Sequence, residues 1–238
     1  MKFEKLSIIL CILLSFGFSV KEKLPTVFVI GDSISMQYGP FLQNQLKGFF
    51  DYDRKKDNGR GESNLDNPEG ANGGDSRMVL EYLELKQNDP TFKPDMLLLN
   101  CGLHDIKRNS QTSVIQVDEV QYRQNLEAIW RIATKKNIQL IWLRTTPVVD
   151  ERHNTRSKVF HRFAKDVDTY NAIADDVFSK KNIPVIDLYQ FTLNLGDETY
   201  IDHVHYNESV RALQAAFIAG SLITLTKKSR GNTGRINR

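Results

Sequence analysis

The sequence has little cysteine: Cys11 and Cys101 are the only two in 238 residues. Cys11 lies in an apolar N-terminal stretch, so the rest of the chain holds one thiol and cannot form an intramolecular disulfide. Internal repeats and low-complexity linkers are also absent, which favours a single domain. With 40% hydrophobic and 26% charged residues, the chain can build one sizeable core, and that core has to stabilise the fold.

The apolar stretch at the N-terminus, from Leu6 to Phe18, is too short for a comfortable membrane span. It follows a basic start and precedes the small Ser19 and a polar segment, 21–23. This order is typical of a secretory signal peptide. We therefore expect residues 1–20 to be removed, leaving a secreted or periplasmic protein with no integral membrane span. A retained N-terminal anchor is the alternative.

Neither sign of charge is in large excess, since the net charge is only +3. Without the five basic residues in the last twelve positions, the rest of the chain carries −2 (3 − 5). These five residues are Lys227, Lys228, Arg230, Arg235 and Arg238. We expect one domain over 21–226, a flexible basic tail over 227–238, and no nucleic-acid partner.

Short β-branched and aromatic runs alternate with segments of helical periodicity. The expected strands are Thr26–Ile30, Met96–Asn100, Ile138–Leu143 and Pro184–Leu188. The expected helices are Met36–Phe50, Ser76–Lys86, Val117–Lys136, Lys158–Lys181 and Glu208–Thr226. The polar, glycine-rich segment 51–75 is expected to be a long loop with at most one short strand. This alternation predicts an α/β fold with a mainly parallel sheet, helices on both faces, and a site at the carboxyl ends of the strands.

Ser33 follows the first predicted strand directly, in the segment Gly31-Asp32-Ser33. Gly31 permits a sharp turn, and the helix that follows points its first amides toward the serine. Such amides favour developing negative charge. The same motif also occurs as an ordinary helix cap, so Ser33 needs a base before it can be considered a nucleophile.

Asp202 and His205 provide that base. A histidine activates a serine best when a carboxylate binds its other ring nitrogen, and the spacing Asp-x-x-His in a turn allows that contact. Two alternatives are a capping aspartate with a surface histidine, and a zinc site formed by Asp202, His203 and His205 with His104. The zinc site leaves Ser33 without a role.

Two further blocks contain candidate donors for an oxyanion. The segment Gly73-Gly74-Asp75-Ser76 can turn a backbone amide toward the serine, and Gly74 is the candidate. The segment 100–105 reads Asn-Cys-Gly-Leu-His-Asp and ends a predicted buried strand. By itself the double glycine is also typical of a simple turn before a helix.

Together these four blocks resemble the SGNH/GDSL hydrolase superfamily in order and placement, from Val27 to about Leu225, within a bacterial subgroup that has Gly-Leu-His-Asp in the third block. The resemblance implies a flavodoxin-like three-layer α/β/α sandwich and no cofactor. It implies Ser33 as nucleophile, His205 as base and Asp202 as its orienting carboxylate. It also implies oxyanion donors from Ser33, Gly74 and the third block.

The chain departs from this family pattern at two positions. His104 stands where the family has its oxyanion asparagine, and an imidazole N–H replaces an amide only in the right tautomer or when charged. Asp105 is a candidate to orient it. His203 stands where glycine is common, which matters if that position needs a positive φ.

We expect a carboxylic ester hydrolase that removes short acyl groups, with acetyl on carbohydrate favoured because the segments expected around the site are polar. Asp32, Arg77 and Asp105 are candidate substrate contacts. The alternatives are a lipid esterase or thioesterase, an O-acyl transferase with the same nucleophile, and a non-catalytic binding protein with this fold.

Overall fold

The computed structural model describes residues 23–56 and 64–233, and its main sheet has five parallel strands in the order β2-β1-β3-β5-β7. The strands are β1 (Thr26–Ile30), β2 (Asp51–Arg54), β3 (Met96–Leu99), β5 (Gln139–Leu143) and β7 (Val185–Ile186). Numbered along the sheet alone, this order is 2-1-3-4-5, as in flavodoxin-like folds. The predicted fold class is confirmed, and the topological switch point lies between β1 and β3.

The centre of the sheet is apolar on both faces. All four residues of β3 are buried, as are Val27 to Ile30 of β1. Val27 pairs with Met96, and Ile30 pairs with Leu99, so the carboxyl ends of the two strands lie next to each other. The segments that follow these strands therefore begin side by side.

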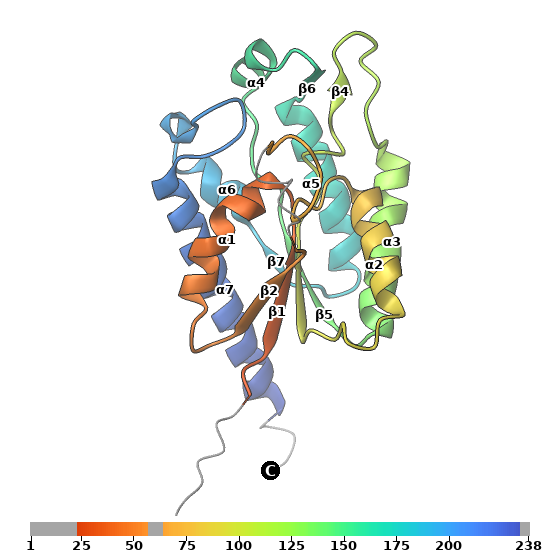
Figure 1. The fold of residues 1–238 in the computed structure, drawn as a ribbon, viewed down its shortest axis with the longest axis vertical. Coiled ribbons are helices and arrows are strands. Elements are labelled where there is room, and N and C mark those ends of the chain that lie inside the picture. The colour runs from red at the N-terminus through yellow and green to blue at the C-terminus, as the bar shows by residue number, and fades with distance from the viewer. Residues whose placement is uncertain (1–22, 57–63, 234–238) are drawn as a thin grey trace, which may run out of the picture.

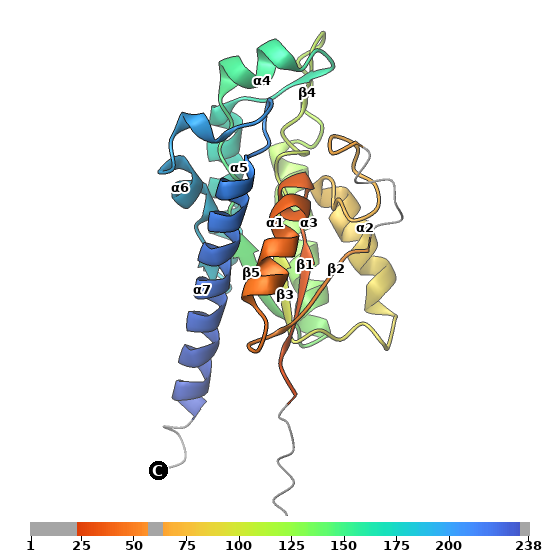
Figure 2. The same cartoon turned by 60° about the vertical axis from the view of Figure 1, so that its left-hand side comes forward.

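Helices cover both faces of the sheet (Figures 1 and 2). On one face α7 packs against α1 and α6, and on the other face α3 packs against α2 and α5. The first group is α1 (Ser33–Gln45), α6 (Leu188–Leu193) and α7 (Glu208–Thr233). The second group is α2 (Ser76–Gln87), α3 (Glu119–Lys135) and α5 (Ala164–Ser179).

A small cap lies over one end of the domain, opposite the end at which the described chain enters and leaves (Figure 1). It contains an antiparallel pair, β4 (Arg108–Asn109) and β6 (Phe160–His161), and the short helix α4 (Asp150–Arg156). A 3-10 turn, Asp197–Thr199, precedes the segment that leads into α7. The cap follows the carboxyl ends of β3 and β5, where the fold places its site.

Several boundaries differ from the sequence prediction because side chains from other segments set them. The helix expected from Lys158 begins only at Ala164, because Phe160 and His161 pair with β4 and the Ala164 amide donates to Asp150 Oδ1 at 2.6 Å. Segment 150–156, for which the sequence predicted neither a helix nor a strand, is the helix α4. The first helix starts at Ser33, three residues early, because Asp32 caps it.

The last helix continues to Thr233, into the segment expected to be a tail. Its part from Glu208 to Lys227 is, in the described residues, the one helix long and apolar enough to cross a membrane, with a mean hydropathy of 1.3. About a third of that part is buried, at 33%. The predicted signal peptide, 1–20, and residues 234–238 lie outside the described residues, so cleavage and the absence of a membrane span stay predictions.

Candidate active site

Ser33, His205 and Asp202 form a continuous hydrogen-bonded chain. His205 Nε2 lies 2.9 Å from Ser33 Oγ, and His205 Nδ1 lies 2.7 Å from Asp202 Oδ2. Ser33 and His205 are 172 positions apart in sequence and are both buried. The arrangement allows the imidazole to accept the serine proton while the carboxylate binds its other nitrogen.

The Asp202 carboxylate is fixed by the turn in which it lies. Its Oδ1 accepts hydrogen bonds from the backbone amides of Val204 at 2.8 Å and His205 at 2.7 Å. Burial alone raises the pKa of Asp202, but the bonds from His205 and from the two amides outweigh it and hold the pKa below its usual value. The carboxylate is therefore ionised at neutral pH and can stabilise an imidazolium.

Ser33 owes its position to the junction between β1 and α1. Asp32 caps α1 by accepting the Ile34 amide at 2.9 Å, which makes Ser33 the first helical residue. The first amides of a helix have no acceptor within the helix. The Ser33 N–H is one of these, and the dipole of α1 favours negative charge beside it.

His104 lies in the turn after β3 with an exposed fraction of only 1%. Its Nδ1 is buried and has no hydrogen-bond partner among the described residues. Burial lowers the pKa of His104 well below its usual value, and the charges of Lys107, Arg162 and His205 lower it further. His104 is therefore neutral near pH 7 and has one N–H to donate.

The turn that carries His104 is anchored through the backbone carbonyls before it. The Cys101 carbonyl accepts hydrogen bonds from Thr145 Oγ1 at 3.0 Å and Tyr122 Oη at 3.1 Å. Gly102 adopts φ +150°, and a side chain there would overlap the Thr145 hydroxyl. Only glycine fits, and the position of His104 is thereby fixed relative to β5.

The Gly74 amide donates to Asn72 Oδ1 at 2.9 Å, within its own loop. Gly74 has φ +71°, a conformation for which glycine has no steric cost. Since this amide is already bonded, it can serve an oxyanion only after the Asn72 bond breaks. Its assignment as an oxyanion donor stays a prediction.

The three proposed substrate contacts bind groups inside the protein. Asp32 caps α1, as described, and Arg77 pairs with Asp75 at 2.8 Å. Both oxygens of Asp105 accept from the Ser76 amide, at 2.9 and 3.1 Å, so Asp105 holds the start of α2 and does not orient His104 as expected. Burial raises the pKa of Asp105 to about 7.

His203 does not need the backbone conformation that glycine favours, because it is not among the residues with positive φ. Its Nε2 lies 3.1 Å from Asp66 Oδ1, and its ring is edge-on to His205. No group of three His, Cys, Asp or Glu side chains in the described part of the chain is arranged to hold a metal ion. The imidazole of His205 instead faces Ser33.

The sequence analysis identified neither Arg162 nor Lys107 as a residue of the site. Arg162 is 2% exposed and donates from Nε to the Leu103 carbonyl at 2.6 Å, next to His104. Lys107 is 8% exposed and donates to the Asp66 carbonyl at 3.2 Å. No local pattern marks either residue, because both are identified by contacts with distant segments.

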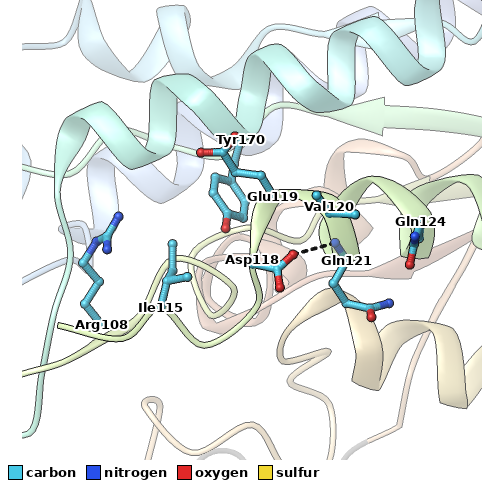
Figure 3. Close-up of a pocket in the computed structure, with 8 residues that line it drawn as sticks. All are labelled: Arg108, Ile115, Asp118, Glu119, Val120, Gln121, Gln124 and Tyr170. Atoms are coloured by element: carbon cyan, nitrogen blue, oxygen red, sulfur yellow. Dashed lines mark hydrogen bonds between the residues drawn. The ribbon is translucent and has the colours of Figure 1, made fainter. Parts of the chain in front are cut away.

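A hollow of about 410 Å³ lies beside this region, between Arg108 of β4, the start of α3 and Tyr170 of α5 (Figure 3). The Asp118 side chain there accepts the Gln121 amide as the cap of α3. None of the three hydrogen-bonded residues lines this hollow. The hydrogen-bonded chain lies elsewhere, at the carboxyl end of β1.

Solved structures with this fold include several acylhydrolases. A lipase/acylhydrolase from Enterococcus faecalis is 18% identical, with a TM-score of 0.62, covering 84% of this chain and 96% of that one. An acetyl xylan esterase, AlAXEase, is 18% identical with a TM-score of 0.58, covering 84% and 98%. The esterase EstA from Pseudoalteromonas, inhibited by monoethylphosphonate, is 13% identical with a TM-score of 0.60, covering 85% and 98%. These likenesses show the fold.

Sequence comparison identifies the family more directly. Comparison with curated proteins finds no match. Residues 29–212, however, match the GDSL-like Lipase/Acylhydrolase family, and this segment contains both ends of the hydrogen-bonded chain from Ser33 to Asp202. The chain therefore belongs to the GDSL-like lipase/acylhydrolase family, and it is a carboxylic ester hydrolase.

Proposed function

We propose that Ser33 is the nucleophile of a two-step ester hydrolysis, with His205 as general base and Asp202 as its orienting carboxylate. The single observation that carries this proposal is the unbroken chain of hydrogen bonds from Ser33 Oγ to Asp202 Oδ2. A serine hydroxyl is a weak nucleophile until an adjacent base takes its proton.

In the first step His205 Nε2 takes the Ser33 proton while Oγ bonds to the acyl carbon. The tetrahedral intermediate then collapses, and the alcohol leaves with the proton from His205. In the second step His205 deprotonates a water molecule, which attacks the acyl-serine. The acid leaves, and the proton returns to Ser33 Oγ.

The oxyanion formed in both steps needs donors that are already in place. We assign the Ser33 amide and the neutral imidazole of His104 to this role, with the Gly74 amide as a third donor once Asn72 releases it. The support for His104 is its buried, unpartnered Nδ1 and its anchored turn. The tautomer is not fixed by a partner on Nδ1, so either nitrogen can carry the proton.

The proposed substrate is a short acyl ester, acetyl in the simplest case, on a carbohydrate outside the cytoplasm. The cap near the site supports it, because polar residues there suit hydroxyl-rich ligands. A groove of about 710 Å³ in the cap is lined in part by Asn109, Thr112, Gln116 and Phe160. A long acyl chain would need an extended apolar surface, since each buried methylene contributes roughly 0.8 kcal/mol.

The second candidate is a lipid esterase or thioesterase. One observation favours it: Val114 and Val159 line the same groove and are 66% and 78% exposed. Ile115 and Phe160 also line the groove, so half of its lining residues are apolar. The acyl chain length decides between the two candidates. Acyl transfer to a sugar would use the same nucleophile and would show as an acylated product.

The test compares wild type with Ser33→Ala on p-nitrophenyl esters from acetate to decanoate, and on acetylated xylan and pectin. We expect the highest wild-type rate at acetate, acetate release from at least one polymer, and a fluorophosphonate adduct on Ser33. The alanine variant should keep its thermal midpoint and lose roughly 10⁴-fold or more in rate.

Activity of Ser33→Ala above one percent of wild type would refute the assignment of Ser33 as the nucleophile. Rates that climb from acetate to decanoate, with no acetate from either polymer, would replace the carbohydrate substrate with a lipid.

A further inference from the structure

Two buried cations next to the proposed site lack an ion pair. Arg162 and Lys107 are 2% and 8% exposed, and neither has a carboxylate oxygen within 4.0 Å among the described residues. A buried charge without a partner costs free energy, so such groups are usually paired. Arg162 and Lys107 lack this ion pair at the edge of the sheet where we expect the substrate to bind.

The partners of Arg162 are neutral. Its Nε donates to the Leu103 carbonyl, and its Nη1 lies 3.0 Å from His153 Nε2. Burial lowers the pKa of His153 to about 3, and the Arg162 charge contributes, so this imidazole accepts the bond as a neutral group. Its Nδ1 lies 3.0 Å from Asn154 Oδ1 and carries the proton. The guanidinium charge is therefore not neutralised by the groups it binds.

Lys107 is held in a similar way. Its Nζ donates to the Asp66 backbone carbonyl and lies 4.5 Å above the Phe160 ring. Burial, with the nearby Arg162 charge, lowers the pKa of Lys107 to about 8, which still leaves it mostly protonated at pH 7. The Arg162 guanidinium lies 4.8 Å from the same ring. Phe160 of the cap thus holds both cations in one place.

The carboxylates whose charges act on these two cations are hydrogen-bonded to other groups. Asp66 Oδ1 lies 3.1 Å from His203 Nε2, and Asp32 caps α1. Both attract Arg162 and Lys107 at longer range, and Asp75, which pairs with Arg77, also attracts Lys107. These charges reduce the positive potential at the cluster, but none of them forms an ion pair with either cation.

The two cations also lie close to His104, the proposed oxyanion donor. The charges of both lower the pKa of His104, and Arg162 binds the carbonyl directly before it. Lys107 in addition lines the cap groove with Gln116 and Phe160. A group bound in that groove therefore contacts Lys107.

We infer that Lys107 and Arg162 form a subsite for a negatively charged group of the substrate, so that the ester lies on an acidic sugar, such as one carrying a carboxylate. The inference rests on the proposed ester hydrolysis and names its substrate class. A carboxylate in the subsite would accept charge-assisted hydrogen bonds and supply the missing partner.

The test uses the O-acetylated methyl glycoside of galacturonic acid and its methyl ester, which differ by one negative charge. We expect the wild-type kcat/KM to favour the acid by about tenfold or more, as for one charge-assisted hydrogen bond. Lys107→Met should bring this ratio close to one, while Lys107→Arg should keep most of it. Lys158→Met, which removes an exposed lysine of the cap, should leave the ratio unchanged.

A purely structural role for Lys107 would lower both rates together and leave the ratio unchanged, which would overturn the inference. A wild-type ratio of one or less, with both compounds hydrolysed, would also overturn it and leave the proposed function intact. No acetate from either compound or from p-nitrophenyl acetate would refute the proposed function and the inference with it. Arg162→Lys provides a second variant that keeps the charge, and it should retain more of the ratio than Lys107→Met.

Discussion

The segment of Asp202 and His205 and the turn of His104 each bring a buried histidine to the carboxyl end of the sheet, in opposite electrostatic surroundings. His205 has Asp202 on one nitrogen and Ser33 on the other. His104 has an unpartnered nitrogen and lies among positive charges. The first environment suits a group that gains a proton, and the second suits a neutral hydrogen-bond donor.

The comparison teaches that residue type alone does not assign these roles. A carboxylate next to an imidazole stabilises its charged form, whereas burial beside cations destabilises it. The neighbours of each histidine are therefore the basis of the role that we propose for it.

Removing the carboxylate from the first histidine should have the largest effect. Asp202→Asn should lower kcat by about 10⁴-fold, since the amide favours the wrong tautomer of His205. The thermal midpoint should change little, because Asn Oδ1 can still accept the Val204 and His205 amides. Steady-state kinetics on p-nitrophenyl acetate measure the loss.

Asp66→Asn is the matched control, because Asp66 binds the neighbouring His203 instead of His205. Its loss should be far smaller. Equal losses for the two variants would mean that general electrostatics near the site, not the bond to His205, accounts for the effect.

Removing the second histidine should have an intermediate effect. His104→Ala should lower kcat by about 10²- to 10³-fold, as for one oxyanion donor, and His104→Asn should keep much of the activity. His161→Ala, a control on β6, should stay near wild type. Activity that is lost on chelation and restored by zinc would instead assign His104 to a metal.

The last prediction concerns stability instead of rate, at Asp105, which follows His104 and holds the start of α2. Burial, together with the nearby Asp75 charge, raises its pKa to about 7 despite the Ser76 bonds. The native state therefore binds this proton more tightly than the unfolded chain. Stability contributed by the protonated form is present at low pH and is lost as the pH rises from about 4 to about 7, by roughly 4 kcal/mol.

Asp105→Asn keeps an acceptor for the Ser76 amide and removes this titration. Relative to wild type, the variant should be more stable at pH 8 than at pH 5, as measured by urea unfolding. Asp118→Asn, at the exposed cap of α3, is the matched control for replacing a carboxylate that binds the first turn of a helix. The same difference between variant and wild type at both pH values would contradict the prediction.

Much of the fold could be predicted from sequence because its signals are local. The runs 27–30 and Met96–Leu99 are apolar at every position and follow turn signals, so they indicate buried parallel strands. The start of α2 at Ser76 was predicted from the residues around it. The β4–β6 pair was missed, since two-residue strands have no periodicity and depend on each other.

The residues of the candidate site also fall into those with a local sequence signal and those without one. Ser33, Asp202 and His205 were predicted because each lies in a short motif with a chemical meaning. The contact of Arg162 with Leu103 spans 59 positions, and that of Lys107 with Asp66 spans 41. No spacing along the chain indicates such contacts, so both cations were found only in the folded chain.

The sequence by itself determined the alternation of strands and helices, the serine after β1 and the paired aspartate and histidine before α7, because caps, turns and periodicity act over a few residues. The tertiary structure alone decided that His104 is neutral, that Asp105 holds α2 instead of His104, and that two cations lie unpaired beside them. The physical reason is that burial and the distance between charges set these properties, and both arise only when segments far apart in the chain pack together.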